Sequence, residues 1–148
     1  MAITVRDPNT IWLGGPKDVI ENIINDFAAK EAITPGMLLD LDSTTSVNRW
    51  KKAATAKSPT TSVAKDAPML NKGIDDNYAI GDLVEVFAGS PGTTFLAIIP
   101  SGQTIAFGDK LENAGTGKLR AWTDASQAFR ALEAKTATAD TRIRVEVL

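Results

Sequence analysis

Three short stretches, each with a glycine just before an apolar-containing run, constrain the fold of this chain most strongly. They lie at residues 33–39, 79–84 and 105–111. Glycine adopts positive φ without a Cβ clash, and the aspartates that follow two of the glycines are turn formers that hydrogen-bond their own turns. Each stretch therefore predicts a tight turn that leads into a strand. The predicted structural turn residues are Gly36, Gly81, Asp82, Gly108 and Asp109.

Strand-like runs recur from residue 78 onward at intervals of about ten residues, with glycine turns between them. The last run, residues 142–147, alternates strictly and places Ile143, Val145 and Val147 on one face. Residues 37–41 form another strand candidate, whereas residues 126–134 fit a strand or a helix equally well. This pattern predicts a mainly β fold, a compact β-sandwich or small, tulip-like barrel.

The N-terminal segment, residues 1–31, is predicted to be an arm with one helix. Between residues 17 and 30 the apolar side chains recur at helical spacing, and Pro16 and Asp18 suit the first turn of a helix. An extended segment is the alternative, because the apolar positions include three isoleucines and a valine. The β-rich domain is expected to span residues 32–148.

A basic segment follows the first predicted strand. Between residues 43 and 73 there are six Lys and Arg residues against one acid, so this segment is about +5 and the remainder about −7, given the net charge of −2. The segment lacks hydrophobic periodicity, which predicts an extended basic loop at about residues 43–72. An exposed Trp50 would be unfavourable, so we expect it to anchor the loop on its own domain or on a neighbour. Single-stranded nucleic acid is a second possible partner, although only one aromatic residue supports it.

The composition excludes much familiar active-site chemistry. The chain has no cysteine and no histidine, so it lacks thiolate nucleophiles, disulfides and the commonest general base. The glycines of residues 115–118 lack the spacing of a phosphate loop and predict a hairpin turn. No apolar run is long enough to span a bilayer, and the first residues lack the features of a secretory signal. We therefore predict no catalytic residues, no metal, no cofactor and no membrane association.

Several segments, taken in order, resemble the capsid decoration (cement) proteins of tailed bacteriophages. They are residues 32–38, 71–84, 103–112, 131–134 and 142–147. The resemblance implies a β-rich, non-enzymatic body that assembles as homotrimers and binds the outer surface of the phage head. There it would staple neighbouring major capsid proteins and stabilise the shell. The protein would be made in the host cytoplasm and located on the virion, with the major capsid protein and itself as partners and no direct contact to nucleic acid.

The residues expected to reach the capsid or an adjacent subunit lie in two places. The first is the N-terminal segment and the second is the basic loop; together they contribute Ile3, Val5, Trp12, Arg49, Trp50, Lys51 and Lys52. Two other classes of function stay open. A carboxylate-dependent enzyme would need the acid pairs Asp40 with Asp42 and Asp75 with Asp76 to converge. A non-catalytic module would instead bind carbohydrate or nucleic acid.

Overall fold

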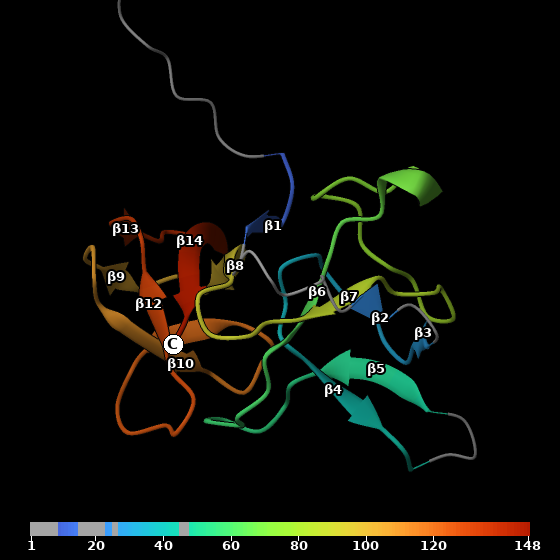
Figure 1. Cartoon of the computed structure of the whole chain (residues 1–148), viewed down its shortest axis with the longest axis horizontal. Coiled ribbons are helices and arrows are strands. Elements are labelled where there is room, and N and C mark those ends of the chain that lie inside the picture. Colours follow the sequence, from blue (N-terminus) through green and yellow to red (C-terminus); the bar gives the residue numbers. More distant parts are fainter. Residues whose placement is uncertain (1–8, 15–22, 25–26, 45–47) are drawn as a thin grey trace, which may run out of the picture.

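A computed structural model of the chain describes residues 9–14, 23–24, 27–44 and 48–148. In these residues the fold is mainly β, as predicted, and the helical content is limited to one 3-10 turn, η1 (Pro68–Leu70). The largest element is a six-stranded antiparallel sheet (Figure 1). Its strands, in spatial order, are β1 (Trp12–Gly14), β8 (Thr94–Ile99), β14 (Thr141–Val147), β12 (Phe129–Ala131), β10 (Lys110–Asn113) and β11 (Leu119–Ala121).

Strands β8 and β14 are the longest strands of this sheet, and they pair with each other. Their register pairs Ile143 with Ala97 and Val145 with Phe95. The alternation predicted for the last strand is confirmed, because Ile143, Val145 and Val147 are all buried. Since side chains alternate between the two faces of a strand, this register places the apolar set of β14 on the core side.

The described residues also form three smaller sheets. Figure 1 shows two of them beside the large sheet, on the right of the view. The first contains β2 (Ile23–Ile24), β7 (Val86–Ala88) and β6 (Ser62–Ala64); the second contains β3 (Ala28–Ala29), β5 (Arg49–Lys52) and β4 (Leu39–Asp42). The third pairs β13 (Lys135–Thr136) with β9 (Thr104–Ile105). The β3–β5 pair is parallel.

In the part of the chain that the structure describes, the buried apolar side chains form two clusters. The larger cluster lies against the six-stranded sheet and includes Phe95. The ring centre of Phe95 lies 5.8 Å from that of Phe87 and 5.9 Å from that of Phe129, and both ring pairs are edge-to-face. The smaller includes Trp50 and Tyr78. Edge-to-face rings add to the stabilisation that burial gives. In the described part of the chain, the structure contains no helix that could cross a lipid bilayer.

The helix predicted for residues 17–30 is wrong where the structure describes this segment. Residues 23–24 form β2, which pairs with β7, and residues 28–29 form β3, which pairs with β5. Residues 17–22 and 25–26 lie outside the described residues. The β-branched side chains favour extended structure, and pairing with strands far along the sequence decides the outcome. The division of the chain near residue 31 remains a prediction.

The segment at 43–72 differs from the expected extended loop. It contributes β5 and β6 to two sheets and carries η1, although its composition is polar and lysine-rich. The ambiguous stretch at 126–134 contains strand β12. The turn predicted at residues 115–118 joins β10 to β11. Its Gly115 has φ of +90°, and a Cβ there would lie 2.8 Å from the backbone nitrogen of Ala56. The turn therefore packs closely against the backbone of residues 54–56.

Candidate functional site

Trp50, predicted as a contact residue, is buried within its own chain. It lies on β5 opposite Leu41 of β4, and its side chain is 2% exposed. Its ring meets Phe27 edge-to-face, with 6.0 Å between the ring centres. Trp50 therefore anchors the basic segment on its own domain, the first of the two roles that we considered.

Much of the positive charge of this segment is paired. Asp42 is buried on β4, forms a hydrogen-bonded ion pair with Lys30, and lies 4.0 Å from the ammonium group of Lys51. The hydrogen bond from Lys30, followed by those from Thr44, holds the pKa of Asp42 well below its usual range. Lys57 pairs with Asp124. The segment therefore presents less free positive charge than its composition suggests.

The other predicted contact residues have varied positions. Ile3 and Val5 lie outside the described residues. Trp12 lies on β1, half-buried against the larger apolar cluster. Lys52 on β5 donates its backbone N–H to Glu31 Oε1 at 2.8 Å. Arg49 faces Asp42 across the β4–β5 pair.

The acid pairs considered for catalysis serve separate local contacts. Asp75 accepts a hydrogen bond from Arg142 Nη1 at 2.9 Å, and Asp76 accepts one from the backbone N–H of Gly73 at 2.8 Å. Burial raises the pKa of Asp40, and the charge of Lys51 opposes that increase. Among the residues that the structure describes, no group of three acidic side chains is arranged to hold a metal ion.

Two turns share one construction, and the aspartates predicted to stabilise them do so. In the first, Ala79 N–H donates to Asp82 Oδ2 at 2.9 Å, and Asp82 N–H donates to Ala79 O at 3.0 Å. In the second, Ala106 and Asp109 form the same two bonds, at 2.8 and 3.2 Å. The intervening glycines have φ of +89° and +86°, which glycine adopts without strain. Both turns are thus closed by backbone and side-chain hydrogen bonds.

Each of these turns presents one large apolar side chain to solvent. Ile80 is 69% exposed and Phe107 is 73% exposed. Sequence reasoning identified the glycine and the aspartate but missed the residue that precedes them. The available signal was its place at the second position of an Ala-x-Gly-Asp turn, because connecting segments almost always lie on the protein surface. We refer to Ile80 and Phe107 as the turn tips.

A third exposed apolar site lies on η1. Its Met69 is 94% exposed, and the flanking residues Ala67 and Lys72 close the turn with reciprocal backbone hydrogen bonds of 2.9 and 3.0 Å. Figure 1 shows η1 at the periphery of the molecule, above β6 and β7 in this view. An exposed methionine on a closed turn is an adaptable apolar contact.

Glu112 of β10 is the most elaborately bonded carboxylate in the described part of the chain. It is fully buried and accepts hydrogen bonds from Arg120 Nε and Thr123 N–H, both at 2.9 Å, and from Ala125 N–H at 3.3 Å. Burial alone would raise its pKa, but the hydrogen bonds outweigh burial and lower the pKa to about 2. The ionised group therefore fixes the β10–β11 hairpin to the loop that follows β11.

Together, the fold and these surfaces define a mainly β protein with apolar side chains displayed on closed turns. No family model matches the sequence, and no curated protein matches it at a significant level. A solved structure does match: the N base of the head fiber protein gp8.5 of bacteriophage phi29. The identity is 15% and the TM-score is 0.57, over 87% of this chain and 93% of that chain. The likeness shows that the two proteins share a fold.

Proposed function

We propose that this chain is a non-enzymatic structural protein of a bacteriophage head, attached to the outer surface of the capsid on the virion. The observation that carries the proposal is the fold shared with the phi29 head fiber base over nearly the full length of both chains. The segments that resemble decoration proteins, which occur in the same order along the chain, support the same role. In this role the chain would bind the major capsid protein and bridge neighbouring copies of it.

The turn tips are our leading candidates for the contact surface. The backbone of a turn closed by hydrogen bonds loses little conformational freedom when the turn binds, so more of the burial energy of its side chain is available for affinity. Full burial of an Ile or Phe side chain contributes about 1.5–3 kcal/mol. The exposed Ile80 and Phe107 are side chains of this kind on such turns.

We further propose that the chain acts as a homotrimer. Three linked copies would engage a shell together, so that modest contacts per copy give durable attachment through effective concentration. Binding that favours the intact arrangement of the shell over a separated one stabilises that arrangement. Trimeric attachment would therefore strengthen the seams between capsid proteins.

Most of the contact residues predicted in the N-terminal and basic segments stay in the proposal, and the two tryptophans are given a different role. Ile3, Val5, Arg49, Lys51 and Lys52 remain proposed contacts. For the buried Trp50, and for the half-buried Trp12, we propose a supporting role beneath the contact surface. Deletion of residues 44–66 would remove both β5 and β6, so the test requires point substitutions.

We expect Phe107→Ser and Ile80→Ser each to reduce the affinity for purified heads by about tenfold, because each removes the burial of one large apolar side chain. The measurement is cosedimentation of the purified variants with heads of the source phage that lack the protein. Both side chains are exposed, so the thermal unfolding midpoint is expected to stay close to that of the parent.

Leu148→Ser provides the matched control. Leu148 is also exposed, but it is not carried by an Asp-closed turn, so its replacement is expected to leave binding within about twofold of the parent. Unchanged affinity in both turn-tip variants would remove these residues from the contact surface.

A further inference from the structure

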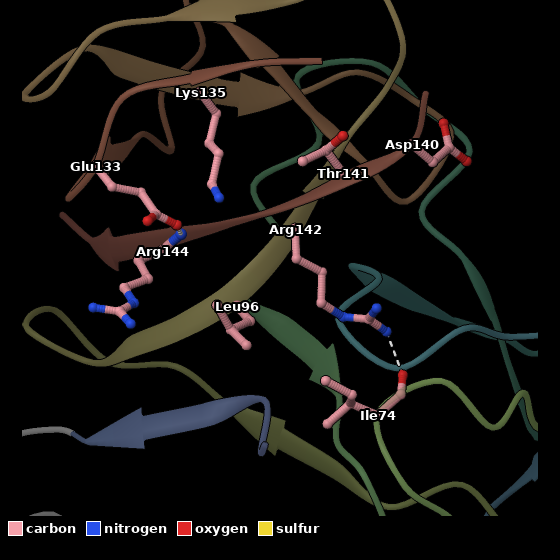
Figure 2. A pocket seen from close by; sticks show the side chains of 8 residues that line it. All are labelled: Ile74, Leu96, Glu133, Lys135, Asp140, Thr141, Arg142 and Arg144. Atoms are coloured by element: carbon pink, nitrogen blue, oxygen red, sulfur yellow. Dashed lines mark hydrogen bonds between the residues drawn. The ribbon is translucent and has the colours of Figure 1, made fainter. Parts of the chain in front are cut away.

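A pocket of about 370 Å³ opens beside strand β14 (Figure 2). Neither turn tip lines this pocket. Arg142 and Arg144 extend from β14, and Lys135 extends from β13. Leu96 of β8 and Ile74 supply an apolar wall. The pocket is thus built from residues 74 and 96 and from two segments near the C-terminus, 133–135 and 140–144, and its volume is within the range of small-ligand sites.

Arg142 is a fixed part of the pocket wall. Its guanidinium donates to Asp75 at 2.9 Å, to the backbone carbonyl of Pro35 at 3.1 Å, and to the carbonyl of Ile74. Figure 2 shows this group directed toward Ile74 and away from Lys135. These bonds hold the Ile74 segment against β14 and leave the other cations to face the pocket.

The two acids that line the pocket have partners. Asp140 pairs with Lys118 at 2.8 Å, and Glu133 Oε1 accepts the backbone N–H of Arg144 at 2.9 Å. Among the described residues, the side chains of Lys135 and Arg144 form no ion pair. Three cations against two carboxylates leave one positive charge in excess in the lining.

We propose that this pocket binds a single carboxylate side chain, Glu or Asp, carried by an extended peptide segment with an apolar neighbour. The planar fork of Arg144 matches a carboxylate in two-point geometry, and Lys135 adds a second positive charge. The apolar neighbour would contact Ile74 and Leu96. A nucleic acid fits less well, because one excess positive charge cannot balance successive phosphates and releases few counterions.

This inference rests on the proposed function in one respect: the acidic segment would belong to a protein of the phage head. The pocket chemistry itself is testable without heads. The probe is a short blocked peptide with a central Leu-Glu-Leu sequence, compared with a twin in which glutamine replaces the glutamate. Binding is followed by backbone amide shifts in an NMR titration of the whole protein.

We expect the glutamate peptide to shift the amides of Ile74 and Arg144 saturably and to bind at least about tenfold more tightly than its glutamine twin, since a charged hydrogen-bonded pair is lost in the twin. Arg144→Gln and Lys135→Gln should each weaken binding by about tenfold. Arg130→Gln is the matched control: Arg130 lies on the adjacent strand β12 and is paired with Glu146 at 2.8 Å, so its loss should leave peptide binding unchanged.

Equal binding of the two peptides, or undiminished binding by Arg144→Gln, would overturn the proposal. Tighter binding of a thymidine oligonucleotide than of the glutamate peptide at the same salt concentration would also overturn it, in favour of a polyanion site. Because heads are absent from this titration, its failure leaves attachment to heads untouched. Conversely, a failure to bind heads leaves the peptide result standing.

Discussion

Replacement of Glu112 by glutamine is expected to lower the free energy of unfolding by about 3 kcal/mol, because it leaves Arg120 without its partner and weakens the bonds to the buried carboxyl position. The structural basis is the hydrogen bonding of Glu112 to Arg120, Thr123 and Ala125 in a fully buried position. Urea unfolding followed by circular dichroism measures the difference. Glu146→Gln is the control, since its pair with Arg130 is partly exposed and should contribute less than about 1 kcal/mol.

The same residue gives the stability a defined pH dependence. The hydrogen bonds, which outweigh burial, lower the pKa of Glu112 from its ordinary value of 4.5 to about 2 in the folded protein. Its stabilising contribution is therefore complete above pH 4.5 and is lost as the pH falls from 4.5 toward 2. The stability gap between the parent and Glu112→Gln should narrow over that interval. A gap that is constant down to pH 2, or equal losses in the two glutamine variants, would contradict this role for Glu112.

Substitution of Gly36 by alanine is expected to destabilise the fold by about 3 kcal/mol, the sum of backbone strain and a steric clash. Gly36 has φ of +98°, and a Cβ there would lie 2.7 Å from the carbonyl oxygen of Leu96 on β8. To relieve this contact, either the turn at Gly36 or strand β8 must move. The change is measured by equilibrium unfolding in urea.

Gly81→Ala separates the two causes. Gly81 has a similar φ of +89°, but no atom lies within 4 Å of the position that a Cβ would occupy, so only backbone strain of about 1 kcal/mol is expected. Equal losses in the two variants would show that the approach of Gly36 to β8 is unimportant.

The elements that follow from local pattern were predictable. The strict alternation of residues 142–147 places one face of β14 in the core, and the glycine–aspartate turns close as their composition requires. The turn hydrogen bonds join residues three apart, and the strand is marked by its own alternation even though its partners β8 and β12 are distant in sequence. The burial of Ile143 and the hydrogen bond from Ala79 to Asp82 are examples.

The strands whose own sequence lacks a hydrophobic pattern were missed. Strand β5 reads as a basic loop because Arg49 and Lys51 flank its single apolar residue. In the fold, these cations lie opposite Asp42 and Asp40 of β4, so residues of opposite charge face each other across the strand pair, a relation that the composition of β5 alone does not indicate. The alternating acids of β4 and alternating bases of β5 were the overlooked signal.

The candidate surfaces were harder to predict than the fold. Apolar residues are ordinarily assigned to the core, and Ile80 and Phe107 are exposed only because of their position in a turn. The pocket beside β14 combines residues from positions 74 to 144, and no local motif joins them. Tertiary topology alone brings such residues together.

The proposed attachment to the outside of the phage head is tested by binding of the unmodified protein to heads that lack it. The measurement is the number of bound copies per head at saturation, with their position determined by cryo-electron microscopy. We expect saturable binding on the outer surface, in a number of copies divisible by three. Absence of binding to intact heads, or a position inside the shell, would contradict the proposed function.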